Sequence, residues 1–215
     1  MKKFILILSI LLLLPCAINA QECQSSTECA IMGKKLLEQK EYKNAIECFN
    51  KSINMDENEY FSYAYRAKAN YYLKNYEQAL KDADKSISIK PNSRAFGIKS
   101  SIDLLNGDYR KAIENSTKAL ELNPNYMKCY EVRARAELEL EDYISALKDS
   151  TKAINLRNNY AKSYEVRAIA YAGIKDYNSA FSDAENAAKI FKQNKDRKNY
   201  KKMKKLVKQY KGKIK

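Results

Sequence analysis

The sequence predicts an all-α protein built as an α-solenoid, a right-handed superhelix of five helix-turn-helix units with a C-terminal capping helix. The first observation is a tyrosine that recurs at intervals of 34, 33, 34 and 34 residues. The second is an alanine three residues after each of these tyrosines. Self-similarity at such a period is typical of stacked supersecondary units. The recurring tyrosines are Tyr42, Tyr76, Tyr109, Tyr143 and Tyr177.

Residues 1–20 have the order of a secretory signal peptide, with Lys2 and Lys3 before an apolar run over 4–14 and a small-residue end at Ala20. The apolar run is too short for a transmembrane helix, which needs about 17 to 25 residues. We therefore expect cleavage after Ala20 and export to the periplasm or the medium. Two alternatives stay open. One is lipid attachment at Cys16, and the other is a retained membrane anchor.

Four cysteines follow the predicted cleavage point, and an oxidising compartment permits disulfides. Stacked units keep the fourth unit far from the first, beyond the roughly 7 Å between Cα atoms that a disulfide spans. Cys129 is therefore expected to be unpaired. Cys23 with Cys29 is the preferred pair, because the segment before the first helix can bend. Cys29 with Cys48 is an alternative, and so are three buried thiols without a bridge.

The unit at residues 127–160 shows the pattern in detail. Tyr130, Ala134 and Leu138 repeat at helical spacing in its first half, and the second half repeats from Tyr143 onward. Glu141 lies in the turn between the two helices. We expect a signal peptide at 1–20, a repeat domain at 21–194 and a Lys-rich amphipathic helix at 195–215. The five units are expected at 26–59, 60–92, 93–126, 127–160 and 161–193.

This pattern resembles the tetratricopeptide repeat. The family's turn tyrosine and the alanine after it are present in all five units, and its closing proline is present as Pro91 and Pro124. The resemblance implies that the first helices line a concave groove that binds a protein or peptide segment, without catalysis. The family's small first-helix residue stands at Gly33, Ala67, Ser100, Ala134 and Ala168.

A second correspondence joins arginines of first helices to aspartates sixteen residues later. It holds in the second, fourth and fifth units and is absent from the first and third. Our interpretation is a salt bridge between the two helices of one unit, and a role in ligand binding is the alternative. The pairs are Arg66 with Asp82, Arg133 with Asp149, and Arg167 with Asp183.

Mapping the groove of the family onto this chain gives basic side chains above an apolar floor, which suits a peptide with acidic and hydrophobic residues. A solvated face with tyrosines that fill space between units is the alternative. The clamp that some family members use for chaperone tails is absent, because Ala30, Lys34 and Tyr65 stand at its positions. The predicted groove residues are Lys34, Lys68, Tyr71, Tyr72, Leu104, Glu131, Arg135, Leu138 and Glu165.

The net charge of +14 is concentrated near the C-terminus, since residues 189–215 carry thirteen basic residues against Asp196. One helical stripe there runs from Tyr200 through Met203 to Tyr210, as expected for a helix that caps the stack. The alternative is attachment of this basic helix to anionic lipid or polymer at the envelope surface. Nucleic acid is not expected as a partner of an exported protein.

The residue types give little support for catalysis. The chain contains no histidine, and no nucleophile with its base, metal cluster or glycine-rich phosphate loop can be assembled from its motifs. We therefore expect a protein that is not an enzyme, with no metal, no cofactor and no small-molecule substrate. Its partner is expected to be a protein or peptide.

Overall fold

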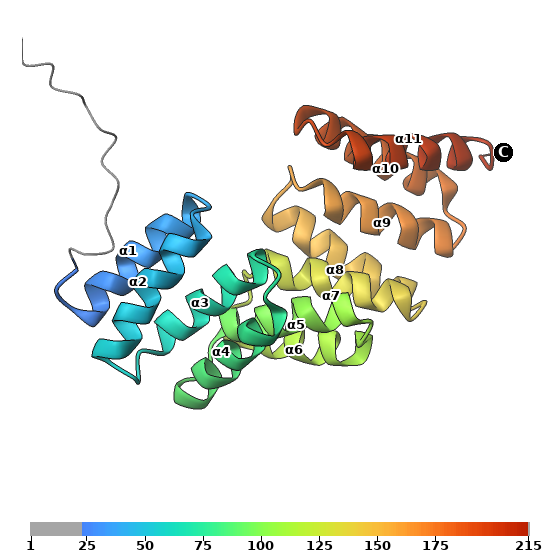
Figure 1. The fold of residues 1–215 in the computed structure, drawn as a ribbon. Helices are drawn as coiled ribbons and strands as arrows, with labels where there is room; N and C mark the ends of the chain where they lie inside the picture. Colours follow the sequence, from blue (N-terminus) through green and yellow to red (C-terminus); the bar gives the residue numbers. More distant parts are fainter. Residues whose placement is uncertain (1–22, 215) are drawn as a thin grey trace, which may run out of the picture.

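The computed structural model describes residues 23–214, all of whose regular elements are helices (Figure 1). The predicted all-α solenoid is confirmed. The predicted signal peptide and the lipid-attachment site at Cys16 lie outside the described residues. The helices are α1 (Ser26–Glu38), α2 (Tyr42–Met55), α3 (Tyr60–Tyr72), α4 (Tyr76–Ile89), α5 (Ser93–Asn106), α6 (Tyr109–Leu122), α7 (Met127–Glu139), α8 (Tyr143–Leu156), α9 (Ala161–Gly173), α10 (Tyr177–Gln193) and α11 (Arg197–Lys211).

The recurring tyrosines open the second helix of each pair, as Tyr76 does for α4. One residue before the N-cap, the turn requires a backbone in the left-handed region. Gly107 meets this requirement without a steric penalty at φ 80°, whereas side-chain-bearing residues such as Lys74 adopt it at φ 65°. Tight turns of this kind set the two helices of a unit antiparallel. The same left-handed turn, at Lys195, precedes α11.

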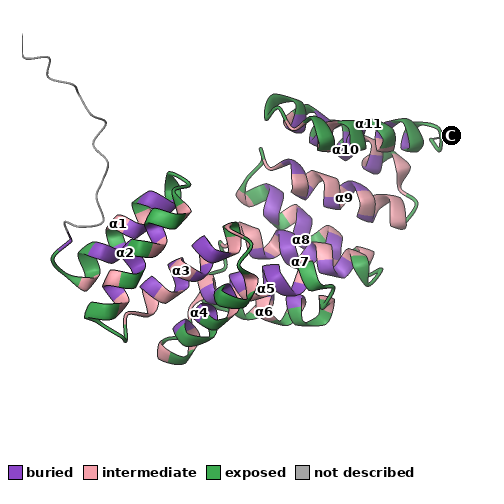
Figure 2. Ribbon diagram, viewed as in Figure 1, coloured by how far each residue is buried: buried purple, intermediate pink, exposed green. Residues whose placement is uncertain are grey.

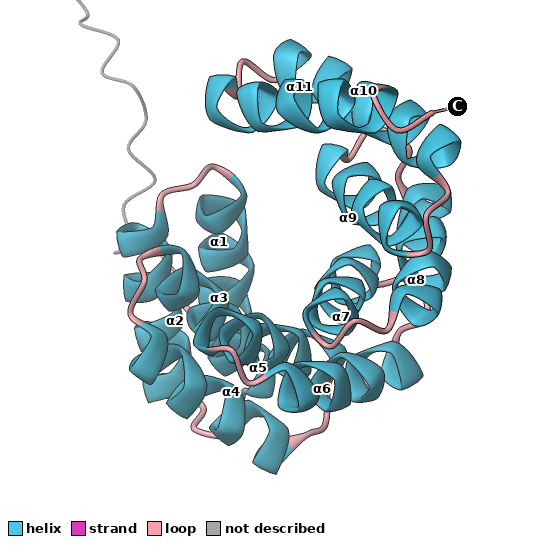
Figure 3. Cartoon of the chain, turned by 90° about the vertical axis from the view of Figure 1, so that its right-hand side faces the viewer, coloured by secondary structure: helices cyan, strands magenta, loops and turns pink. Residues whose placement is uncertain are grey.

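The helices form two layers around a curved axis. The first helices α1, α3, α5, α7 and α9 contact one another from unit to unit. Figure 3 shows these helices around the hollow of the curve, with α2, α4, α6 and α8 outside them. The inner layer is therefore the concave face, where the first helices of successive units present their side chains to one continuous surface.

Small residues allow the close approach of paired helices. Fully buried alanines fill most facing positions, and Figure 2 shows buried residues where neighbouring helices meet. The first unit packs a glycine against a phenylalanine, and a Cβ added at Gly33 would lie 2.6 Å from Phe49 Cε1. The large ring of Phe49 thus occupies the space that a side chain at position 33 would need.

The last helix, α11, packs on α10 and covers that end of the stack (Figure 1). Met203, Val207 and Tyr210 are buried in this contact, while the lysines between them stay largely exposed. The apolar stripe of α11 is thus used for packing within the chain.

The four cysteines of the described residues divide into one disulfide and two buried thiols. Cys23 and Cys29 form a disulfide across a Cα–Cα distance of 5.1 Å, just before and within the first turn of α1. Cys48 and Cys129 are free and buried. Neither alternative arrangement from the sequence, Cys29 with Cys48 or three free thiols near the first unit, is present.

Over residues 23–214, no helix combines the length and the apolar character that a membrane crossing requires.

A concave groove with two pockets as the candidate functional site

A ladder of buried ion pairs holds the inner and outer layers together. Arg66 donates to both oxygens of Asp82, with Nη2 at 2.7 Å from Oδ1 and Nε at 3.0 Å from Oδ2. The pairs Arg133–Asp149 and Arg167–Asp183 have the same two-bond geometry. The aspartates are 2 to 4% exposed, so these bidentate contacts act in a shielded environment.

Each arginine also reaches the preceding unit. Its third donor bonds a residue sixteen positions earlier, on the second helix before it: Asn50 for Arg66, Thr117 for Arg133 and Thr151 for Arg167. One side chain therefore ties together three helices in two units. The sequence predicted only the contact within a unit.

The third unit replaces this ladder with other polar contacts. Lys99 pairs with Asp84 on α4 of the preceding unit, and Asn115 donates to Asp103 at 2.7 Å. Compared with the second unit, the amide and the carboxylate have exchanged places: there Asn70 on the first helix donates to Asp82 on the second helix. Burial raises the pKa of the Asp103 carboxyl, and the bond from Asn115 counters this effect.

A pocket of about 360 Å³ opens on the concave face between α3, α5 and α7; we call it the aromatic pocket. Tyrosine rings and three cationic side chains form most of its wall, and none of its lining residues is acidic. Tyr72 is 48% exposed and stacks on Tyr42, with 4.9 Å between ring centroids. The lining residues are Lys68, Tyr71, Tyr72, Gly97, Ile98, Ser101, Tyr126, Met127, Lys128, Arg157 and Tyr160.

The cations of the aromatic pocket have different partners. Burial tends to lower the pKa of Lys128, but an ion pair with Glu131 more than offsets this, so the pKa is raised. Burial and the positive charge of Arg94 lower the pKa of Lys68. The exposed Arg157 donates to the neutral Asn159 at 3.1 Å. Lys128 is therefore neutralised by an acid, whereas Lys68 and Arg157 present positive charge to the pocket.

A packed floor supports the aromatic pocket. A Cβ added at Gly97 would lie 2.9 Å from Tyr126 Cε1 and 3.1 Å from the sulfur of Cys129. Glycine at position 97 therefore lets the Tyr126 ring lie directly on α5. Burial raises the pKa of Tyr126 to about 12, so its phenol is neutral at physiological pH.

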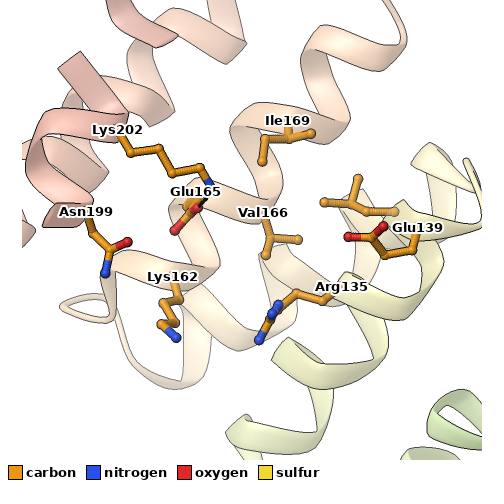
Figure 4. A pocket seen from close by; sticks show the side chains of 9 residues that line it. Arg135, Glu139, Lys162, Glu165, Val166, Ile169, Asn199 and Lys202 are labelled. Carbon is orange, nitrogen blue, oxygen red and sulfur yellow. Dashed lines mark hydrogen bonds and ion pairs between the residues drawn. The ribbon is translucent and has the colours of Figure 1, made fainter. Parts of the chain in front are cut away.

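A second pocket of about 240 Å³ lies between α7, α9 and α11; we call it the basic pocket (Figure 4). Lys202 of α11 pairs with Glu165 of α9 at 2.5 Å. Figure 4 shows the nitrogen ends of Arg135 and Lys162 on the same side of Val166. Lys162 makes no ion pair within the described part of the chain. The lining residues are Arg135, Leu138, Glu139, Lys162, Glu165, Val166, Ile169, Asn199 and Lys202.

Glu131 connects the two pockets from below. Its side chain is fully buried, and its carboxylate pairs with Lys128 on one side and with Arg135, at 3.5 Å, on the other. The sequence placed Glu131 among the residues that contact a partner. The structure contradicts this prediction, because Glu131 is fully buried and cannot contact a partner. Its two ion pairs instead position Lys128 and Arg135 at the groove.

The structure brings most predicted groove residues into the two pockets. Lys68, Tyr71 and Tyr72 line the aromatic pocket, and Arg135, Leu138 and Glu165 line the basic pocket. Three lie outside both linings: the buried Glu131, Lys34, whose Nζ is 4.0 Å from Glu38 Oε1, and the half-buried Leu104.

Sequence reasoning missed the residues at the junctions between units. Tyr126 and Tyr160 precede α7 and α9, and Lys128 and Lys162 are the second residues of these helices. Both pairs are 34 residues apart, the period of the repeat. Extending the repeat comparison to the segments between units would have found them.

Comparison with known proteins supports the repeat assignment. Residues 29–59 and 93–126 match the sequence model described as tetratricopeptide repeat. A TPR repeat-containing protein of Methanocaldococcus jannaschii is 35% identical over 108 residues, which are 50% of this chain and 19% of that protein. The matched region thus spans about a fifth of this relative's length.

Solved structures share the fold at low sequence identity. PilF of Pseudomonas aeruginosa superposes with a TM-score of 0.67 at 14% identity, over 86% of this chain and 90% of that chain. YrrB, described as a TPR protein with an unusual peptide-binding site, gives 0.62 at 15% identity, over 84% and 92% of the two chains. Residues 29–59 and 93–126 therefore match the tetratricopeptide repeat, and the chain shares the α-solenoid fold of these solved structures.

Proposed function

We propose that this protein is an exported, non-catalytic scaffold that binds a segment of another protein in its concave groove. The observation that carries the proposal is the pair of neighbouring pockets on the inner layer. The aromatic pocket combines the exposed Tyr72 with Lys68 and Arg157, which form no ion pair in the described part of the chain, and the basic pocket adds the unpaired Lys162. Such a surface can bind an extended segment along several first helices. The peptide-binding site described for YrrB, a protein of the same fold, supports this proposal.

Two observations favour export to the periplasm or the medium. Residues 1–20 have the order of a signal peptide, and the Cys23–Cys29 disulfide suits an oxidising compartment. Lipid attachment at Cys16 remains the alternative form of the exported protein. Mass spectrometry of the N-terminal peptide from the native cell distinguishes the two forms. A chain that begins at Gln21 supports cleavage after Ala20, and a chain that begins at a lipid-modified Cys16 supports lipid attachment instead.

Photo-crosslinking in the native cell tests the groove. A photoreactive phenylalanine analogue at Tyr72, in the aromatic pocket, is expected to trap a partner protein. The matched control carries the same analogue at Ile144, which is 67% exposed on α8 in the outer layer. Adding Lys68→Glu and Arg135→Glu to the Tyr72 variant is expected to abolish the product. Equal trapping from both positions would place the binding surface elsewhere.

A second candidate function is attachment to anionic lipid or polymer through α11. The outward lysines favour it, but the apolar residues Met203 and Val207 are buried against the repeats, so no apolar face remains for insertion. Attachment would therefore be electrostatic and sensitive to salt. Sedimentation with vesicles of phosphatidylglycerol and phosphatidylcholine tests it. Removal of binding by Lys201→Gln, Lys204→Gln and Lys208→Gln supports it, and unchanged binding rejects it.

A further inference from the structure

We propose that the aromatic pocket binds an acidic side chain that stands beside a bulky apolar residue in an extended segment of the partner. A second acidic side chain, about three residues away, enters the basic pocket. This inference rests on the proposed function of the groove and adds the chemistry of the bound segment.

Charge is the first argument. The aromatic pocket has three cationic side chains in its wall and no acidic one. Glu131 neutralises Lys128, but Lys68 and Arg157 form no ion pair within the described part of the chain, and only the more distant charge of Glu38 favours the charged form of Lys68. Burial, and then the positive charge of the nearby Arg94, lower the pKa of the Lys68 ammonium. A carboxylate bound in the aromatic pocket would give Lys68 and Arg157 an anionic partner and offset the repulsion between Lys68 and Arg94.

The tyrosines supply the second argument. Tyr71 and Tyr72 meet edge to face, with 5.7 Å between their centroids, and Ile98 and Met127 lie beside them in the pocket wall. This surface is apolar except at the phenol oxygens, so an aromatic or branched aliphatic side chain can bury against it. The pocket therefore selects a carboxylate and a large apolar group in adjacent positions.

The basic pocket supplies the second anion position. Arg135 has one contact with Glu131, at 3.5 Å, which leaves most of its donors available, and Lys162 has no ion pair in the described chain. On α7, Lys128 lines the aromatic pocket and Arg135 lines the basic pocket, and these two residues are seven positions apart. At 1.5 Å per residue this separation is about 10 Å, which an extended chain covers in about three residues. A segment that fills both pockets therefore carries two acidic side chains about three residues apart.

Selection from a library of twelve-residue peptides, amidated at the C-terminus, tests the inference on the purified full-length protein. The amide removes the terminal carboxylate as an alternative anion. We expect enriched peptides to carry an acidic residue beside a bulky apolar one and a second acidic residue about three positions away. Affinities of the strongest peptide are then measured by fluorescence anisotropy. Enrichment of neutral or basic peptides would overturn the inference.

Charge-removing variants locate each acid. Lys68→Gln with Arg157→Gln is expected to weaken the strongest peptide about tenfold or more, and a peptide with its first acid changed to the amide should lose little further affinity. Arg135→Gln with Lys162→Gln should act in the same way on the second acid. The control, Lys81→Gln with Lys118→Gln, removes two outer-layer cations that pair with neighbouring glutamates.

The outcomes distinguish the inference from the function on which it rests. Peptides that crosslink to the groove at Tyr72 without a preference for acids contradict the inference and leave groove binding intact. Peptides that never reach Tyr72, or a library that yields no binder, count against both. If the aromatic-pocket variant binds as tightly as the unmodified protein, the acid does not enter the aromatic pocket.

Discussion

Arg133 donates to both carboxylate oxygens of Asp149, with Nε at 2.5 Å from Oδ2 and Nη2 at 3.0 Å from Oδ1. Asp149 is 4% exposed, and the buried carboxyl of Glu137 on the same inner helix as Arg133 adds to the acidic character of the site. The second unit has a different environment, because Asp82 also accepts bonds from Asn70 and Gln78. Loss of the arginine is therefore expected to cost more stability in the fourth unit than in the second.

Replacing Arg133 by alanine is expected to lower the free energy of unfolding by about 3 to 5 kcal/mol, since it leaves Asp149 buried beside Glu137 without its cation. Arg66→Ala should cost roughly 2 kcal/mol less, because two neutral donors still bind Asp82. Urea unfolding followed by circular dichroism measures both. The exposed pair Lys118–Glu114 serves as a control, and Lys118→Ala should change stability by about 0 to 1 kcal/mol. Equal losses in the two arginine variants would contradict this account.

Glu137 makes stability depend on pH. Burial and the charge of Asp149 raise the pKa of the Glu137 carboxyl to about 8, and its Oε2 has no hydrogen-bond partner among the described residues. The folded protein therefore binds this proton more strongly than the unfolded chain does. The stability that the proton contributes is fully present below about pH 4 and is lost as the pH rises through about 8.

Glu137→Gln should accordingly be as stable as the unmodified protein near pH 5 and more stable at pH 9, by about 2 kcal/mol after allowance for partial exposure of the carboxyl. Thermal unfolding at a series of pH values measures the difference. Glu139→Gln, an exposed substitution on the same helix, should show no such trend. A constant difference between the Glu137→Gln variant and the unmodified protein across this range would show that Glu137 titrates normally.

The third unit lacks the arginine bridge and can be given the arrangement of the second. The triple substitution Lys99→Arg, Asp103→Asn and Asn115→Asp reproduces Arg66, Asn70 and Asp82 and should raise the free energy of unfolding by about 1 to 2 kcal/mol. Asn115→Asp alone should destabilise the protein, because it places a second carboxylate beside Asp103. Denaturant unfolding of both variants measures the two changes in the free energy of unfolding. Stabilisation by the single substitution would mean that Asp103 is not ionised in the folded protein.

The fold was predictable because one requirement repeats in every unit. A turn tyrosine with an alanine one helical turn later, as in Tyr143 and Ala146, fixes the pairing of two helices wherever it occurs. The arginine bridges were predictable for the same reason, because an arginine and an aspartate stand sixteen residues apart in three units, as Arg133 and Asp149 do. The pockets were only partly predictable. Arg157 and Tyr160 lie between units, and Glu131 is buried by contacts that arise only when neighbouring helices pack.

In the first unit, a small residue on the first helix packs against a large residue on the second helix. Gly33 faces Phe49, whereas the corresponding positions of the fifth unit carry two alanines, Ala168 and Ala184. Gly33→Ala introduces a Cβ at 2.6 Å from the Phe49 ring and should cost about 1 to 3 kcal/mol through overpacking, despite the higher helix propensity of alanine.

Phe49→Ala alone should cost about 3 to 5 kcal/mol, because it leaves a cavity in the first unit. The double variant Gly33→Ala with Phe49→Ala reproduces the alanine pair of the fifth unit, and its loss should be smaller than the sum of the two single losses. Denaturant unfolding of the four proteins in this cycle gives the coupling. Strict additivity would show that the ring of Phe49 moves away from position 33 without cost, and that the two sizes are independent.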